Sequence, residues 1–169
     1  MLNFVRKLTK SDNFLYSINK YFFREWSEVA PISIGRILPG VALLDGKVYV
    51  IGGELESCII ANCECYDPRD NVWTPIACME EPRCDFGLCA LDNSLYAFGG
   101  WVGEDIGGSI EIYDPISNTW TLEGYLPEPR FSMGVVAYEG NNSKSKSNNI
   151  IINYDSYMTV KFINIFSFI

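Results

Sequence analysis

Histidine is missing from this chain of 169 residues, and basic residues are scarce in its central part. Without histidine the chain lacks the commonest general base and the commonest metal ligand of proteins, which argues against most acid–base and metal-dependent enzymes. Residues 36–139 carry five Lys or Arg and seventeen Asp or Glu, and the whole chain has a net charge of −8. Because nucleic acids and anionic membranes are bound through basic patches, neither is an expected partner.

The sequence also shows no clear signal for secretion, for a membrane span or for zinc. No apolar run follows Arg6 and Lys7, so no signal peptide is expected. Polar and charged residues interrupt the Ile- and Phe-rich segment Ile150–Ile169, and such groups are costly in hydrocarbon. Paired C-x₂-C motifs are absent, so we expect no metal or other cofactor. The six cysteines are interpreted as reduced, small hydrophobic residues in the cytosol: Cys58, Cys63, Cys65, Cys78, Cys84 and Cys89.

What the sequence does contain is a repeat with a fixed step of 47 residues. Gly52-Gly53 recurs as Gly99-Gly100, and Tyr66-Asp67-Pro68 recurs as Tyr113-Asp114-Pro115. A period of about 40–50 residues is the signature of stacked supersecondary units. Three further residue types keep the same step over three units: Trp26, Trp73 and Trp120; Arg36, Arg83 and Arg130; and Gly40, Gly87 and Gly134.

Each unit has the pattern of four short antiparallel strands. In the second unit, apolar or alternating segments lie at 84–91, 94–98, 109–113 and 119–122, separated by turn residues and one Gly-rich loop. Connections this short join antiparallel neighbours. The sequence therefore predicts an all-β fold. It places two complete four-stranded units at about 36–75 and 83–122 and the first strand of a third at 130–138.

These units resemble the blades of kelch-repeat β-propellers. The resemblance lies in Arg-x₃-Gly, Leu-Tyr-x-x-Gly-Gly, Tyr-Asp-Pro and Asn-x-Trp, and it covers about residues 26–140. It implies a six-bladed propeller in full-length relatives, preceded by BTB and BACK domains. Four stretches are more narrowly similar to the kelch region of actin-binding proteins that combine a BTB domain with kelch repeats: Leu38–Leu44, Gly52–Ser57, Gly99–Ser109 and Leu126–Val136.

The ends of the chain leave the repeat register. Residues 1–25 form an atypical N-terminal segment, and a polar Asn/Ser/Lys tract begins at Asn141. Because a propeller needs about four to eight blades to close, the chain is expected to be a partial propeller, a fragment or truncated product. Residues 141–169 are interpreted as a low-complexity and Ile/Phe-rich tail outside the propeller, read through from non-coding sequence. We expect Met1–Phe23 and Asn141–Ile169 to be poorly ordered or helical.

Two sets of residues carry the predictions about sites. Structural roles are expected for the glycine pairs, which let the chain leave the second strand, and for the aromatic plates between blades: Gly52, Gly53, Gly99, Gly100, Tyr66, Tyr113, Trp73 and Trp120. Partner binding is expected at one face of the ring. The residues proposed for it are Arg36, Arg83, Arg130, Trp101, Glu104 and Asp105.

The arginines have two alternative interpretations. They could bond carbonyls and carboxylates within the blades, or they could form an exposed ring that receives an acidic segment of a partner. In kelch relatives, arginines at this motif position line the substrate face, and the resemblance carries this role to Arg83 and Arg130 in particular. The loops Glu54–Ile60 and Trp101–Ile106 are expected to rim the same face, with Trp101 exposed.

The preferred function is a non-catalytic protein-interaction module. The resemblance implies either binding to actin filaments or recruitment of a substrate to a cullin-type ubiquitin ligase, in a cytoplasmic, cytoskeleton-associated protein. The alternative is a propeller enzyme, an oxidase or a sugar hydrolase. Copper oxidation is disfavoured by the missing histidine, whereas the three arginines could hold a carboxylated sugar. A truncated product without function is the third possibility.

Overall fold

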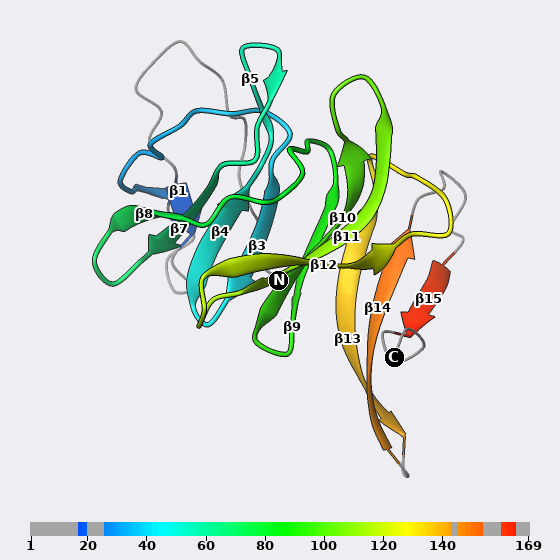
Figure 1. The fold of residues 1–169 in the computed structure, drawn as a ribbon. Coiled ribbons are helices and arrows are strands. Elements are labelled where there is room, and N and C mark those ends of the chain that lie inside the picture. The colour runs from blue at the N-terminus through cyan, green and yellow to red at the C-terminus, as the bar shows by residue number, and fades with distance from the viewer. Residues whose placement is uncertain (1–16, 20–25, 143–144, 154–159, 165–169) are drawn as a thin grey trace.

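Antiparallel sheets make up the computed structural model of the protein, which describes residues 17–19, 26–142, 145–153 and 160–164 (Figure 1). The first four-stranded sheet consists, in spatial order, of β3 (Gly40–Leu44), β4 (Lys47–Ile51), β7 (Cys63–Asp67) and β8 (Val72–Ile76). The second has β9 (Gly87–Leu91), β10 (Ser94–Trp101), β11 (Ile106–Asp114) and β12 (Thr119–Tyr125). The described residues include no helix, so the prediction of an all-β fold is confirmed.

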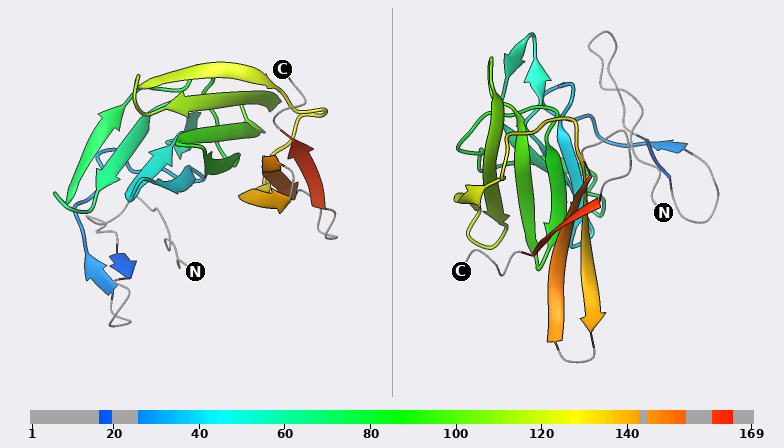
Figure 2. Two further views of the ribbon diagram at one scale, coloured as in Figure 1. Left: turned by 90° about the horizontal axis from the view of Figure 1, so that it is seen from below. Right: turned by 90° about the vertical axis from the view of Figure 1, so that its right-hand side faces the viewer.

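The sheets are arranged as blades of a partial propeller, as predicted. A third sheet contains β13 (Gly134–Asn142), β14 (Ser145–Asn153) and β15 (Val160–Asn164). Viewed from below in Figure 2, the three sheets follow one another around an arc, with β3, β9 and β13 on its concave side. These innermost strands begin at Gly40, Gly87 and Gly134, which keep the 47-residue step.

The hydrophobic cores lie between neighbouring blades. One cluster joins Tyr49 and Ile51 of the first blade to Leu95 and Tyr113 of the second, with the rings of Tyr49 and Tyr113 6.1 Å apart. A second cluster lies between the second blade and the third sheet, and it includes Phe98. Because each blade buries its faces only against its neighbours, a blade has little core of its own, as in other repeat architectures.

The Tyr-Asp-Pro and Asn-x-Trp motifs hold the segment that enters each blade. In the second blade, Asn118 Oδ1 accepts hydrogen bonds from the Ala77 N–H at 3.0 Å and the Tyr113 hydroxyl at 2.8 Å. The Trp120 indole N–H donates to the Ala77 carbonyl at 3.0 Å. The first blade repeats these contacts with Asn71, Tyr66, Trp73 and Ala30. The tyrosines and tryptophans of these motifs therefore fix the connections between blades, which gives a physical basis to their predicted structural role.

The glycine pairs lie where one blade contacts the next. Gly52 and Gly99 both have a φ of 56°, a left-handed conformation that side chains with a Cβ rarely adopt. A Cβ built on Gly52 would lie 2.4 Å from the Arg83 carbonyl oxygen, and one on Gly99 would lie 2.3 Å from that of Arg130. These close approaches allow the next residues, Gly53 and Gly100, to donate backbone hydrogen bonds to the same carbonyls.

The C-terminal tail differs from the expectation. The segment that was expected to be helical or poorly ordered supplies β14 and β15, and β14 pairs with β13 along its whole length. Ile150, Ile151 and Ile152 are β-branched and pair with Ala137, Val136 and Val135, which favours a strand over a helix. The expectation of a helical or poorly ordered segment is therefore wrong for these two strands, whereas the domain boundary at residue 141 stays a prediction.

Two short hairpins complete the described structure. β1 (Ser17–Asn19) pairs with β2 (Trp26–Glu28), and β5 (Glu54–Leu55) pairs with β6 (Cys58–Ile59) in the loop after β4. Most of the N-terminal segment Met1–Phe23 lies outside the described residues. The third strand of the second blade, β11, begins at Ile106, three residues before the predicted start, because β10 and β11 continue their pairing beyond the glycine pair.

Candidate functional site

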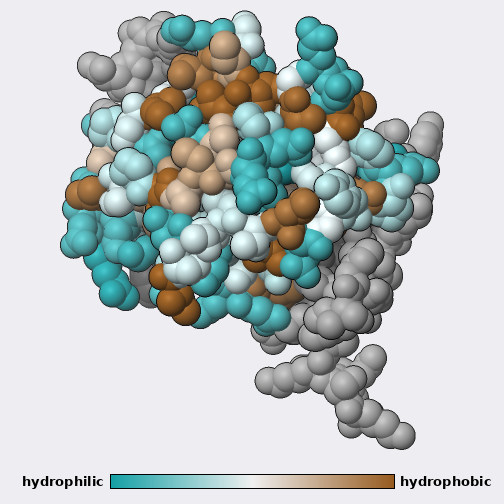
Figure 3. Space-filling view, viewed as in Figure 1, coloured by the Kyte–Doolittle hydropathy of each residue, from teal (hydrophilic) through white to brown (hydrophobic). Residues whose placement is uncertain are grey.

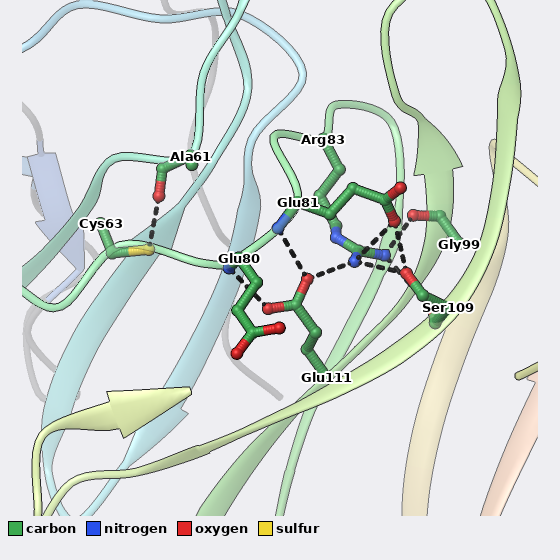
Figure 4. A network of polar contacts seen from close by, with 8 residues as sticks. All are labelled: Ala61, Cys63, Glu80, Glu81, Arg83, Gly99, Ser109 and Glu111. Carbon is green, nitrogen blue, oxygen red and sulfur yellow. Dashed lines mark hydrogen bonds and ion pairs between the residues drawn. The ribbon is translucent and has the colours of Figure 1, made fainter. Parts of the chain in front are cut away.

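Arg83 lies at the centre of a buried polar network rather than on a surface (Figure 4). Its Nη1 donates to the carbonyl of Gly99 at 2.8 Å and to that of Ser109 at 3.3 Å. Its Nη2 donates to Ser109 Oγ at 2.7 Å and forms ion pairs with Glu111 at 2.5 Å and Glu81 at 3.2 Å. The side chain is 0% exposed, and that of Glu111 is 1% exposed.

The carboxylate of Glu111 also bonds the segment that enters the blade. It accepts hydrogen bonds from the backbone N–H groups of Glu80, at 2.8 Å, and Glu81, at 3.2 Å. With the guanidinium of Arg83, these donors satisfy a buried charge that would otherwise be very costly. The network thus connects β10 and β11 to the segment that enters the blade.

Arg36 makes the corresponding contacts in the first blade. Its Nη1 donates to the carbonyls of Gly52 and Asn62, and its Nη2 forms an ion pair with Glu64 at 2.5 Å. The Glu64 carboxylate accepts hydrogen bonds from the backbone N–H groups of Ser33 and Ile34. Both members of this ion pair are buried.

The expected exposed ring of arginines is therefore wrong for Arg36 and Arg83. Each is bound to carbonyls and a carboxylate of its own blade, so neither can receive an acidic segment or a carboxylated sugar without breaking the core. The sequence reasoning missed their acidic partners. Glu64 and Glu111 lie 28 residues after Arg36 and Arg83 and are themselves 47 residues apart, which was the signal that could have found them.

Arg130 occupies a different environment. Its side chain is 31% exposed and pairs with Glu128 at 2.5 Å, across a surface where Glu128 is 70% exposed. Position 158, which lies 28 residues after Arg130, is Met158 and falls outside the described residues. Of the three arginines, only Arg130 lies partly at the surface, so the structure does not bring the three together as one receptor.

The remaining predicted partner-binding residues lie in the loop between β10 and β11. Glu104 and Asp105 are exposed, and the turn is closed by a hydrogen bond from the Val102 N–H to the Asp105 carbonyl at 2.9 Å. Trp101 is only partly exposed, because its ring packs against Phe131 with centroids 4.8 Å apart. This aromatic pair joins the β10–β11 loop to the segment that enters the third sheet.

Backbone hydrogen bonds align the equivalent loops of the three units on one face. The Asp85 N–H donates to the Leu38 carbonyl at 3.0 Å, and the Ser132 N–H donates to the Asp85 carbonyl at 2.8 Å. The three residues are 47 positions apart and share a left-handed backbone, with φ values of 51°, 49° and 53°. We call this surface, with the β5–β6 hairpin and the β10–β11 loop, the loop face. Figure 1 shows that hairpin and that loop at the same edge of the molecule.

The cysteines behave as buried small residues or isolated surface thiols. Cys63, Cys65, Cys84 and Cys89 are buried, and all six described cysteines are free. Burial raises the pKa of the Cys63 and Cys89 thiols to about 12. Among the described residues no group of His, Cys, Asp and Glu side chains has an arrangement that could hold a metal ion. Within the same residues no helix has the length and hydropathy that a membrane span requires.

Comparison with solved structures supports the propeller fold of the sheets. The structure of YjhT superposes with a TM-score of 0.63 at 16% sequence identity, covering 83% of this chain and 55% of that one. At this identity the likeness concerns the fold alone.

Comparison with protein families and curated sequences agrees with the motifs. Human Kelch-like protein 33 is 38% identical over 58 residues, which is 34% of this chain and 11% of that protein. An F-box/kelch-repeat protein of Arabidopsis thaliana is 36% identical over 62 residues, 36% of this chain and 16% of its own length. Mouse Kelch-like protein 28 is 35% identical over 80 residues, 41% of this chain and 14% of its own length. The chain thus spans only 11–16% of these relatives. The Kelch motif family matches residues 35–80 and 82–127, more than half of the sequence, and the chain belongs to the kelch-repeat family.

Proposed function

We propose that this chain provides a protein-binding surface of a kelch-type adaptor, which recruits a protein substrate to a cullin-type ubiquitin ligase in the cytoplasm. The observation that supports the proposal is the loop face. Backbone hydrogen bonds between units hold its loops in place, and large apolar side chains such as Ile37 and Leu38 lie there about half exposed. Large apolar side chains that gather at the surface are typical of interaction sites.

A binding role is favoured over a catalytic one by the position of the charged groups. Arg36 and Arg83 are buried in ion pairs with Glu64 and Glu111, so neither guanidinium is available to a small substrate. The names of the similar proteins point the same way, because they are kelch-like and F-box/kelch-repeat proteins. Binding to actin filaments, in a cytoskeleton-associated protein, is the alternative partner that the resemblance implies.

A site-specific cross-linking experiment tests the proposal. A photoreactive amino acid is placed at Glu104 on the loop face of the full chain, and at Asp70 in the turn between β7 and β8 as a control; both positions are exposed. We expect position 104, and not position 70, to capture a defined protein in cells. Ubiquitylation of that protein should fall when the chain is depleted.

Two outcomes would contradict this proposal. Equal capture at both positions would show that the loop face has no preferred partner. Capture of actin at position 104, together with co-sedimentation of the chain with actin filaments, would replace the adaptor role by actin binding.

A further inference from the structure

Five apolar residues lie on the loop face, and we call them together the apolar loop surface. It consists of Ile37, Leu38, Trp101, Ile106 and Phe131. Four of them are between 37% and 49% exposed, and Trp101 is partly buried. In Figure 3, hydrophobic residues gather along the same upper edge that carries β5 and the β10–β11 loop in Figure 1.

Backbone pairing and one ring contact join the segments that carry these residues. Ile37 pairs with Glu54, and the next residue, Leu38, accepts a hydrogen bond from the Asp85 N–H. Cys84, the neighbour of Asp85, pairs with Trp101, whose ring packs against Phe131. Ile106 is the strand partner of Trp101 in the β10–β11 hairpin. These contacts tie together the segments of three repeat units that carry the five apolar residues.

Leu38 is an unusual residue at its position. It has a φ of 51°, a left-handed conformation that is unfavourable for a residue with a Cβ. The equivalent positions in the other units carry Asp85 and Ser132, and Asp is among the residues that tolerate this conformation best. A strained leucine that is 49% exposed gains little from the core. Strain at an exposed apolar residue points to a role in binding.

The charge around the apolar loop surface has one dominant sign. Within the described part of the chain, Arg130 is the basic residue next to this surface in sequence, and it pairs with Glu128. Because Arg36 and Arg83 are buried and ion-paired, they contribute almost no net positive field to this face. Five acidic residues lie within three positions of one of the apolar residues or bond to one of them through the contacts above: Glu54, Asp85, Glu104, Asp105 and Glu128.

We infer that the apolar loop surface binds a protein segment in which Lys or Arg residues alternate with large apolar residues. The apolar side chains of that segment cover Leu38, Ile106 and Phe131, and its cations lie against the surrounding carboxylates. This inference rests on the proposed function, and it assigns to the partner the opposite charge from the acidic segment that the arginine motif alone suggests. Complementary potentials of this kind increase association rates and select partners.

Three labelled peptides, titrated against the full chain by fluorescence anisotropy, test the inference. The first alternates Lys or Arg with Leu or Phe. The second has Glu in place of every cation, and the third has Ser in place of every apolar residue. We expect only the first to bind well. Its affinity should fall as ionic strength rises from about 0.15 M to about 1 M, where the Debye length shrinks from about 8 Å to about 3 Å.

Variants separate the charge from the apolar contact. Glu104→Gln/Asp105→Asn should weaken binding by about three- to tenfold, as expected for two exposed charge contacts. Asp70→Asn/Glu123→Gln, which changes the net charge equally at exposed positions in the β7–β8 turn and on β12, should leave the affinity unchanged.

A third variant tests the strained position. Leu38→Asn suits the left-handed backbone, so it should weaken binding while the melting temperature stays equal or rises by about 1–4 °C. Ile106→Thr, which keeps a β-branched residue at the start of β11, repeats this apolar test at a position without strain.

Each result has a distinct meaning. Tighter binding of the Glu peptide, or equal weakening by both charge variants, would overturn the charge assignment. If Leu38→Asn lowered the affinity for that Glu peptide, the loop face would still be a protein-binding surface, but its partner would be acidic. Absence of binding by all three peptides would overturn the inference, and the cross-linking at position 104 would still test the proposed function separately.

Discussion

Replacing Arg83 by alanine is the sharpest test of the buried network. The substitution removes a side chain that is 0% exposed and that bonds two carbonyls, one hydroxyl and two carboxylates. It leaves the carboxylate of Glu111, which is 1% exposed, with only the backbone N–H groups of Glu80 and Glu81 as donors. An uncompensated buried charge should therefore destabilise the folded state strongly.

The expected loss follows from measured behaviour of buried pairs. Removing one partner of a buried ion pair costs about 3–5 kcal/mol, and single domains are stable by about 5–15 kcal/mol in total. Arg83→Ala should thus remove a large part of the free energy of unfolding. Arg130→Ala provides the control, because Arg130 pairs at the surface with Glu128 and such pairs contribute about 0–1 kcal/mol.

Urea unfolding followed by tryptophan fluorescence measures both variants. Trp120 lies in the core next to Tyr113, with ring centroids 5.2 Å apart, so its emission should report loss of the blade contacts. A cost below about 1 kcal/mol for Arg83→Ala, or equal costs for Arg83→Ala and Arg130→Ala, would refute the assignment of Arg83 to the scaffold. The double variant Arg83→Ala/Glu111→Leu should lose less free energy of unfolding than the two single variants lose together, because both residues take part in one interaction.

The remaining predictions concern the hydrogen bonds of Asn118 and the cysteine thiols. Asn118→Ala should cost about 1–3 kcal/mol in urea unfolding, since it leaves two donors unpaired, and Asn118→Gly should cost about 1 kcal/mol less, because position 118 has a φ of 54°. Thiol labelling of the native chain should modify Cys58 and Cys78, which are exposed, and reach the four buried cysteines only on unfolding; equal labelling of all six would contradict the packing. Burial raises the pKa of Cys63 and Cys89 to about 12, so the unfolded chain, with thiol pKa values of about 8.5, loses these protons first. The urea midpoint should therefore decrease as pH rises above about 8.5, and a constant midpoint up to about pH 10 would contradict this.

The blades could be predicted from the sequence because their determinants recur at a fixed step. Gly52 and Gly99 occupy equivalent left-handed positions, and Trp73 and Trp120 clamp equivalent alanines. Each residue acts through contacts that its own repeat unit or the adjacent one supplies. A regular pattern therefore translates directly into a regular structure.

The environment of the arginines could not be predicted from the motif alone. Whether an arginine is buried depends on a partner from another strand, and the pairing of Arg83 with Glu111 spans 28 residues. The strands β14 and β15 of the tail could not be predicted for a related reason. The tail contains none of the motif residues of a blade. Its isoleucines nevertheless lie in β14, which pairs with the free edge of β13. Strand pairing needs β-branched residues and an open edge more than it needs a motif.

Positions where the repeat units agree and positions where they differ have different roles in this chain. Arg36 and Arg83 agree, and both are buried in equivalent ion pairs that hold their blades together. The loops that follow the glycine pairs differ: the first unit forms the separate β5–β6 hairpin, whereas the second extends β10 and β11 into one long hairpin. A shared residue supports the shared backbone, and such a residue cannot distinguish one partner from another. Recognition should therefore depend on the loops that differ and on Leu38, which departs from Asp85 and Ser132 at an otherwise equivalent backbone position.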